Sequence, residues 1–240
     1  MLFLNYSEQM SSGGIMQIKP IAYIKSDFSE KFGIPRQSGI VGELASTIVF
    51  EEEYRNPDAV RGLEDFSHLW LIWGFSEVRQ EGWSPTVRPP RLGGNARMGV
   101  FATRSPFRPN PIGLSSVRLD KIEKHVDLGI IIHVLGADLM DGTPIYDIKP
   151  YLAFTDSHPA SIGGFADKPS PRLEVVICEA CKARLPEKKW LVLRDVLALD
   201  PRPAYQDDPS RVYGMSFGGY EIKFSVADNV LTVCGVENGA

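Results

Sequence analysis

Cysteine and long hydrophobic runs are both scarce in this chain of 240 residues. Its three cysteines are an odd number and form no disulfide framework, which favours a reducing, cytoplasmic environment. No apolar run approaches the ~18 residues that a membrane-spanning helix needs. The first residues lack a basic region ahead of a long apolar stretch, so we expect a frayed tail over residues 1–16 and no signal peptide.

A metal site is not expected either. Cys178 and Cys181 have the spacing of a zinc ligand pair, but Cys234 stands alone and the four histidines are scattered along the chain. Structural zinc needs four ligands, and this sequence offers no second pair. We therefore expect no metal, and we interpret His68 in the run FSHLW as a structural strand residue.

Lysine is absent between Arg79 and Arg118, and acids are almost absent there. This segment holds seven arginines and one acid, Glu81, so it carries +6 and leaves −10 for the rest of a chain whose net charge is −4. Such a focused arginine field attracts phosphate groups even on an acidic protein. Pairing of these arginines with surface acids is the alternative interpretation. The residues expected to contact a nucleic acid here are Arg88, Arg91, Arg97 and Arg108.

Short runs rich in Val, Ile and aromatic residues dominate the first two thirds of the chain. They are separated by Gly, Pro, Asn and Asp, a pattern that predicts a mainly β barrel or sandwich. A doubly wound nucleotide-binding sheet would need helices between the strands and a glycine-rich first turn, and neither is present. The expected strands are Ile18–Ile24, Ile40–Phe50, Phe66–Phe75, Met98–Ala102, Leu114–Ile122 and Leu128–Leu135.

The pattern changes after a small, polar and turn-rich stretch at residues 159–171, which we interpret as a linker. We therefore expect a β-rich domain over residues 17–158 and a small α+β domain over residues 172–240. The expected elements of the second domain are a strand at Leu173–Ile177, helices at Glu179–Leu185 and Glu187–Leu199, and a hairpin formed by Tyr220–Val226 and Val230–Val236.

The stretch from Arg88 to Gly113 interleaves arginines with prolines and glycines. Proline fixes φ and glycine permits positive φ, so the stretch predicts sharply shaped loops in place of a flexible linker. Loops held on a rigid scaffold often carry binding residues. The alternative is a pair of wide loops that pack only on themselves.

Several long segments resemble one known family. They are PRQSGI (35–40), GLEDFSHLWLIWGF (62–75), RPPRLGGNARMGVFATRSPFRPNPIGLS (88–115), DLMDGTPIYDIKPY (138–151) and DPRPAY (200–205), and together they are similar to the TsaA-like, or TrmO, family. The resemblance implies a small antiparallel β-barrel that binds S-adenosyl-L-methionine at a homodimer interface, with a second domain that helps to hold tRNA. The implied activity is methylation of N6 of threonylcarbamoyladenosine at position 37 of tRNA.

The resemblance also implies a set of cofactor-binding residues. Arg36 and Arg104 would bind the methionine carboxylate, or alternatively a tRNA phosphate. Asp141 would accept from ribose hydroxyls or lie near the cofactor's ammonium group, although Asp-Gly also simply makes a turn. Leu114 would form an apolar wall for adenine, or be a core strand residue. The full implied set is Pro35, Arg36, Gln37, Ser76, Glu77, Arg104, Leu114, Asp141, Gly142, Thr143 and Pro144.

At one place the sequence departs from the family. Members have His-Gln after the aromatic strand, where this chain has Ser76 and Glu77. Both side chains retain hydrogen-bonding groups, and the backbone can also supply the contact.

Methyl transfer from a sulfonium requires alignment of donor and acceptor more than acid–base chemistry. If a general base takes part, the candidates are Asp147 and Asp200. In DPRPAY, the prolines around Arg202 fix its backbone direction, and Tyr205 offers a ring for an unstacked base; alternatively the two side chains hold the domains together. The other functions left open are a non-catalytic RNA-binding module that responds to S-adenosylmethionine and a methyltransferase with a different acceptor.

Overall fold

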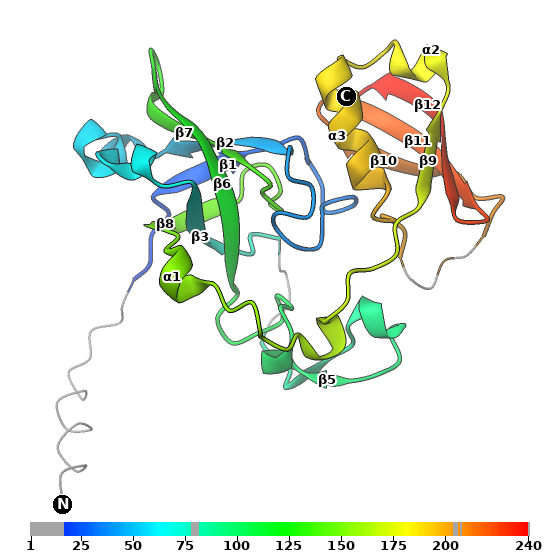
Figure 1. The fold of residues 1–240 in the computed structure, drawn as a ribbon, viewed down its shortest axis with the longest axis horizontal. Helices are drawn as coiled ribbons and strands as arrows, with labels where there is room; N and C mark the ends of the chain where they lie inside the picture. Colours follow the sequence, from blue (N-terminus) through cyan, green and yellow to red (C-terminus); the bar gives the residue numbers. More distant parts are fainter. Residues whose placement is uncertain (1–16, 78–81, 204–205, 207, 240) are drawn as a thin grey trace, which may run out of the picture.

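The computed structural model describes residues 17–77, 82–203, 206 and 208–239, which form two lobes (Figure 1). Each lobe is built around a β-sheet of its own, and residues 158–173 connect them along one side. The tail expected over residues 1–16 lies outside the described residues. No helix in the described part of the chain has the length and apolar character needed to cross a membrane.

Six strands of the first lobe form one antiparallel sheet in the order β1-β2-β7-β6-β3-β8. The last strand, β8, pairs with β1 through only Ala22–Ile145 and Tyr23–Pro144, and this short seam closes the sheet into a barrel. The expected antiparallel, mainly β class is confirmed. The strands are β1 (Ala22–Lys25), β2 (Ala45–Phe50), β3 (His68–Gly74), β6 (Ile112–His125), β7 (Gly129–Leu135) and β8 (Pro144–Pro150).

The core of the first lobe lies inside this sheet. Alternate residues of each strand point inward, as the two-residue period of a strand requires, so that Ile24, Ile48, Leu71 and Ile132 are fully buried. The sequence prediction missed β8, because its run PIYDIKP carries Asp147 and Lys149 and is bounded by prolines. Proline is tolerated here because it occupies the two ends of the strand.

The arginine-rich stretch adds little regular structure. The strand expected at Met98–Ala102 is wrong in extent, since β5 covers only Met98–Gly99 and the chain then turns into a 3-10 helix. β5 pairs with β4 (Thr86–Val87) in a separate two-stranded ribbon. The 3-10 helices among the described residues are Glu52–Tyr54, Pro57–Val60, Leu63–Asp65, Pro90–Leu92, Val100–Ala102 and Gly164–Ala166, the last within the expected linker.

The second lobe is a four-stranded sheet in the order β10-β11-β12-β9, with β9 parallel to β12, and two helices accompany it. Its hairpin turns at Asp228 and Asn229, both at positive φ (50° and 62°), which suits the right-handed twist of the paired strands. The expected helices and hairpin are present. The elements are β9 (Glu174–Ile177), α2 (Glu179–Lys182), α3 (Glu187–Leu197), β10 (Tyr213–Phe217), β11 (Tyr220–Ala227) and β12 (Val230–Asn238).

The segment between β1 and β2 packs into the core of the second lobe. This β1–β2 loop, residues 26–44, starts and ends in the first sheet, yet its Phe28, Val41 and Leu44 are buried in the hydrophobic core of the second lobe. Asp27 accepts a hydrogen bond from Lys189 Nζ of α3 at 2.7 Å, and its carbonyl accepts one from the Gly218 amide at 2.7 Å. The second lobe therefore holds this loop in place.

Candidate cofactor and nucleic-acid site

Three of the expected cofactor residues lie in the β1–β2 loop. Pro35 is buried, Gln37 is half-buried and Arg36 is exposed. The Gln37 side-chain oxygen accepts a hydrogen bond from Arg104 Nη1, and its amide donates to the Arg36 carbonyl. The structure thus brings Arg104, from the arginine-rich stretch, into direct contact with the expected Pro-Arg-Gln segment.

A half-buried carboxylate that the sequence prediction missed, Asp138, lies near Arg104. Asp138 Oδ1 accepts from Ser115 Oγ at 2.6 Å, and Ser115 Oγ in turn accepts from Trp73 Nε1 at 3.0 Å. Burial raises the pKa of Asp138, while Ser115, the charge of Arg104 and the Ser38 amide act in the opposite direction. The signal available in the sequence was its place in the motif DLMDGTP, in which only the second aspartate, Asp141, was predicted to bind the cofactor.

The turn at Asp141–Thr143 is fastened to β1 and to the start of the β1–β2 loop. Gly142 has φ +76°, a value that glycine adopts without strain. The Asp141 amide donates to the Phe28 carbonyl at 2.7 Å, and Asp141 Oδ1 accepts from the Ser26 amide at 3.0 Å. Asp141 Oδ2 also lies 3.6 Å from Lys25 Nζ. Asp141 therefore forms part of the turn and also stabilises the start of the β1–β2 loop.

Two further expected positions lie at the edges of the same region. Ser76 and Glu77, just after β3, are exposed, and the Glu77 carbonyl accepts from Lys31 Nζ of the β1–β2 loop at 2.8 Å. Leu114 is 54% exposed on β6, next to the buried Ser115. Its alternative interpretation as a core residue is wrong, because the side chain points out of the sheet.

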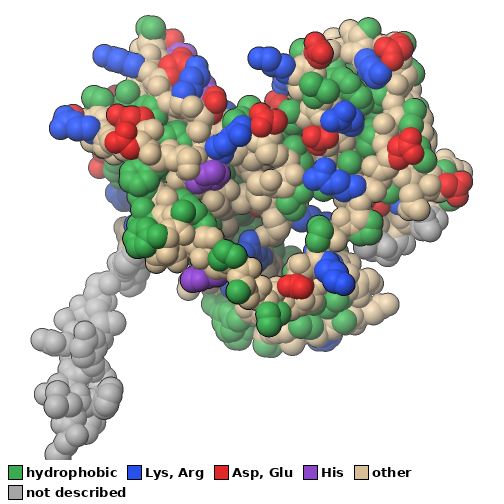
Figure 2. Space-filling model, viewed as in Figure 1, with side chains coloured by type: hydrophobic (Ala, Val, Ile, Leu, Met, Phe, Trp, Pro, Cys, Tyr) green, Lys and Arg blue, Asp and Glu red, His purple; other side chains and the backbone are tan. Residues whose placement is uncertain are grey.

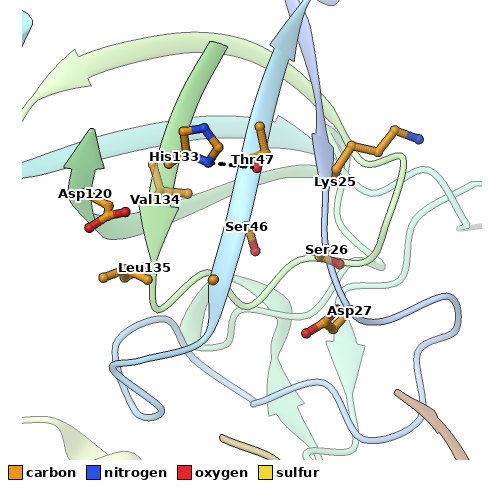
Figure 3. A pocket seen from close by; sticks show the side chains of 10 residues that line it. Lys25, Ser26, Asp27, Ser46, Thr47, Asp120, His133, Val134 and Leu135 are labelled. Atoms are coloured by element: carbon orange, nitrogen blue, oxygen red, sulfur yellow. Dashed lines mark hydrogen bonds between the residues drawn. The ribbon is translucent and has the colours of Figure 1, made fainter. Parts of the chain in front are cut away.

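Two surface hollows, of about 260 and 320 Å³, lie elsewhere on the first lobe. The smaller one is drawn in Figure 3 and lies over β1, β2 and β7, where His133 Nδ1 and Thr47 Oγ1 are 3.2 Å apart. None of the expected cofactor residues lines either hollow.

The candidate bases are both already engaged. Asp147 on β8 accepts from the Ile148 amide at 2.9 Å and pairs with Lys149 at 2.9 Å. Asp200 has φ 54°, and both of its carboxylate oxygens accept from Arg202, at 2.9 and 3.0 Å. The Arg202 side chain is 11% exposed, so this pair is largely buried. Tyr205 lies outside the described residues.

Four arginines expected to bind tRNA surround the small β4–β5 ribbon. Arg88, Arg91 and Arg97 are exposed, whereas Arg108 is half-buried and donates to the Thr103 carbonyl at 3.1 Å. Within the described part of the chain, none of the four forms an ion pair with an acid. Their alternative interpretation as partners of surface acids therefore receives no support from the described contacts.

An exposed aromatic pair on the same ribbon was also missed. The rings of Trp83 and Phe101 stack with centroids 6.3 Å apart, although the residues are 52% and 72% exposed. The signal for it was the presence of large apolar residues within an otherwise polar, arginine-rich stretch. Figure 2 shows Lys and Arg side chains on both sides of the notch between the lobes, with acidic side chains among them.

The Cys-X-X-Cys spacing has a local structural explanation. Cys178 is the residue before α2, and its sulfur accepts from the Cys181 amide at 3.3 Å. Among the described residues, no three of the His, Cys, Asp and Glu side chains are grouped so that they could hold a metal ion.

The groups gathered at the β1–β2 loop suit a ligand with a carboxylate at one end and a flat apolar part at the other. Arg36 and Arg104 supply cationic donors, Gln37 an amide, Asp141 an acceptor and Leu114 an exposed apolar surface. Bidentate pairing of guanidinium with carboxylate and apolar contact with a ring are the interactions that such a ligand requires. S-adenosylmethionine, with its amino-acid and adenosine ends, fits this donor set.

Comparison with known proteins identifies the class. Relatives of this chain carry names that state dependence on or binding of S-adenosylmethionine. The model of the tRNA-methyltransferase O N-terminal domain matches residues 23–157, and that of the TrmO C-terminal domain matches residues 170–239. The chain belongs to the tRNA-methyltransferase O family.

Individual relatives match over most of the chain. A tRNA (adenine(37)-N6)-methyltransferase of Escherichia coli is 44% identical over 231 residues, which are 92% of this chain and 97% of that protein. One of the same name from Eikenella corrodens is 51% identical over 162 residues, covering 67% of this chain and 91% of that one. A crystal structure of TrmO from P. aeruginosa superposes with a TM-score of 0.77 at 32% identity, over 94% of this chain and 98% of the other.

Proposed function

We propose that this protein is an S-adenosylmethionine-dependent methyltransferase that methylates N6 of threonylcarbamoyladenosine at position 37, in the anticodon loop of tRNA. The observation that carries the proposal is the convergence of three segments on the β1–β2 loop. In this loop, Gln37 is hydrogen-bonded to Arg104, the Ser26 amide to Asp141, and Lys31 to the Glu77 carbonyl. Family membership and the names of the E. coli and Eikenella relatives support the same activity.

S-adenosylmethionine supplies a methyl group activated by its sulfonium. In the transfer, the N6 nitrogen forms a bond to the methyl carbon, the carbon–sulfur bond breaks with its electron pair going to sulfur, and the N6 proton leaves. The contribution of this chain is to hold donor and acceptor in line, which can account for several kcal/mol of the barrier. We propose that Arg36, Gln37 and Arg104 hold the amino-acid end of the cofactor, with the Asp141–Pro144 turn and Leu114 on its adenosine side.

Positioning suits this site better than general-base catalysis. Both oxygens of Asp200 are occupied by Arg202, and Asp147 is engaged by Lys149 and the Ile148 amide. A carbamoyl-substituted N6 is also a more acidic nitrogen than the amine of plain adenine. Asp147 and Asp200 remain the candidates if a base takes part, and we propose that the Asp200–Arg202 pair orients the segment before Tyr205.

The tRNA contact proposed here is the ribbon of β4 and β5. Arg88, Arg91 and Arg97 are exposed without an acidic partner among the described residues, and residues 82–118 contain no acid at all. Exposed guanidinium groups pair with phosphates, and the Trp83–Phe101 pair offers a ring face to an unstacked base. Arg108 and Arg202, which are more enclosed, would act from the edges of this surface. The tRNA substrate and the free cysteines both suit a cytoplasmic location.

A homodimer is part of the proposal. Phe107, Ile112 and Leu114 are large apolar residues within one short stretch, and each is at least 38% exposed. A contiguous exposed apolar surface beside a binding site is typical of a protein interface. We propose that a second copy covers this surface and completes the cofactor site.

Transfer of radiolabel from S-adenosylmethionine to purified tRNA tests the proposal. We expect label in tRNA that carries threonylcarbamoyladenosine and none in the same tRNA made without that modification. Binding of the cofactor without transfer would favour the non-catalytic RNA-binding module. Equal labelling of both tRNAs would show a methyltransferase with a different acceptor.

A further inference from the structure

The most enclosed carboxylate of the candidate site has no role in the function proposed above. Asp138 is half-buried, follows β7, and lies next to Ser115 of β6 and near Arg104. Its Oδ1 accepts a hydrogen bond from Ser115 of β6, and the carboxylate also accepts one from the Ser38 amide of the β1–β2 loop. The positive charge of Arg104 acts to lower its pKa. Ser115 and Ser38 each follow an expected cofactor residue, Leu114 and Gln37 respectively. Arg104 is itself an expected cofactor residue.

Asp138 and Arg104 make no direct ion pair among the described contacts. Arg104 Nη1 instead donates to Gln37 of the loop, and the Arg104 charge still acts on the Asp138 carboxylate. A buried negative charge at this place favours a guanidinium above it and opposes its displacement toward solvent. The carboxylate also accepts from the amide next to Gln37, which fixes the other partner of the Arg104 hydrogen bond.

The energetics of Asp138 also indicate a function. Burial of an ionised carboxylate is costly, and burial raises the pKa of this one above the ordinary value of 3.8. A folded-state pKa above the unfolded value means that the ionised group lowers stability, and that this cost is present once the pH exceeds the folded-state pKa. A carboxylate with a raised pKa beside a candidate binding site is itself a candidate for a functional role.

We propose that Asp138 is a positioning residue for S-adenosylmethionine: it binds Ser115 and the Ser38 amide and so holds Arg104 and Gln37 in the geometry that receives the cofactor. This inference rests on the proposed function, since it assumes that the cofactor binds at the β1–β2 loop. Asp138 itself does not touch the reacting atoms. Its side chain links β6 to the β1–β2 loop, and its charge acts on Arg104 of the arginine-rich stretch.

The chain offers a matched control. Asp156 also accepts from an indole, Trp70 Nε1 at 2.8 Å, and from the Leu152 amide at 3.0 Å, but it lies in α1 (Ala153–Asp156) and shares no described contact with the expected cofactor residues. Asp156→Asn therefore removes a carboxylate from a comparable Trp–Asp arrangement. It should leave cofactor affinity unchanged even if it lowers stability.

The test is calorimetric titration of S-adenosylmethionine into the purified full chain, wild type and variants, with melting temperature measured on the same samples. For Asp138→Asn we expect affinity to fall at least about tenfold with no fall in melting temperature. Ser115→Ala, which keeps the carboxylate but removes its donor, should weaken affinity by a smaller factor. Because Asp138 must be ionised to act, wild-type affinity should fall as the pH drops through the raised pKa of its carboxyl group, which faces the guanidinium of Arg104.

A second readout is the Trp73 indole N–H resonance in an NMR spectrum, identified by its loss in Trp73→Phe. We expect it to move on addition of cofactor to the wild type and to stay in place in Ser115→Ala. Equal affinity of wild type and Asp138→Asn for S-adenosylmethionine would overturn the positioning role and leave the proposed function standing. Absence of binding to the wild type and to Asp156→Asn would overturn both.

Discussion

Arg36 is predicted to bind the cofactor and Arg202 to bind tRNA, and the structure gives the two arginines different surroundings. Arg36 is exposed in the β1–β2 loop, whereas Arg202 is largely buried and bound through two nitrogens to Asp200. An exposed guanidinium can exchange water for a ligand carboxylate at little cost to the fold. The largely buried Arg202 instead stabilises the local chain conformation through its two hydrogen bonds to Asp200.

The substitution Arg36→Ala should weaken S-adenosylmethionine binding by about tenfold or more, because it removes a charge-assisted hydrogen bond. Its melting temperature should stay within about a degree of the wild type, since surface changes of this kind are nearly neutral. Arg202→Ala should spare cofactor affinity and reduce methyl transfer to tRNA. Calorimetry and the radiolabel assay on both variants check this; equal cofactor affinity for Arg36→Ala and wild type would remove Arg36 from the site.

At the residue scale the family motifs predicted which residues to examine, and local geometry decided what each one does. Contact between Gln37 and Arg104 joins residues far apart in the sequence, so it could be expected from the resemblance and not from spacing. Asp138 was missed because burial of a polar side chain depends on its neighbours in space. Leu114 shows the opposite error: leucines are usually buried, and this one is exposed because β6 presents it on the outer face.

Among the elements, α1 shows how a short helix is held at the edge of the barrel. Asp156 Oδ2 accepts both from the Leu152 amide at the start of α1 and from the Trp70 indole of β3. These donors lower the pKa of Asp156, with the Leu152 amide as the largest cause. One carboxylate thus closes the helix and fastens it to the sheet.

Replacement of Asp156 by Asn should lower stability at neutral pH, with a difference from wild type that disappears in acid. The pKa of Asp156 is lower in the folded than in the unfolded protein, so its stabilisation is present above the unfolded value near 3.8 and is lost as the pH falls through the folded value. Melting curves of both proteins from pH 7 down to about pH 3 check the prediction. A stability difference that persisted unchanged at the acid end would contradict it.

Element prediction succeeded where the pattern is regular and failed where side chains of mixed type alternate. The strands β2, β3 and β7 follow runs of apolar and β-branched residues, and α3 begins after Pro186 as expected. β8 was missed because Asp147 and Lys149 interrupt its apolar pattern, and β10 because YGMSF is short and contains glycine. In both cases pairing with neighbouring strands compensates for a weak local preference.

For the whole molecule, the main unexpected feature is that the β1–β2 loop is anchored in the second lobe. Phe28 is fully buried there, with its ring edge-on to Phe217 at a centroid distance of 5.4 Å. Proline, glycine and charged residues dominate the loop, so no periodicity in its sequence indicated where these few apolar residues would pack. The second lobe therefore supports the proposed cofactor site without contributing an expected cofactor residue.

Weakening the contacts between the β1–β2 loop and the second lobe should weaken cofactor binding, although these contacts lie outside the expected cofactor residues. Lys189→Met keeps the apolar stem of the side chain but removes the hydrogen bonds to Asp27 Oδ1 and the Gly218 carbonyl, at a cost of about 1 kcal/mol. We expect a several-fold loss of S-adenosylmethionine affinity along with this modest loss of stability, measured by calorimetry and urea unfolding. Lys188→Met on the same helix is the control; an equal effect of both variants would argue against the anchor.

The proposed dimer makes a prediction at the same scale. Leu114→Asp places a charge on the exposed apolar surface and should shift the protein to a monomer in light scattering, with loss of cofactor affinity. Val126→Asp is the control, because Val126 is 97% exposed at the β6–β7 turn, away from that surface. A wild type that is monomeric at all concentrations would contradict the dimer.

The central claim is that the methyl donor binds at the β1–β2 loop, between Gln37 with Arg104 on one side and the Asp141–Pro144 turn on the other. A crystal structure of the full chain grown with S-adenosylmethionine tests it most directly. We predict the amino-acid end of the donor on Arg36 and Arg104, with its methyl group facing the arginine-rich ribbon. Density for the donor in the hollow beside His133, or at any place that leaves the loop untouched, would contradict the account.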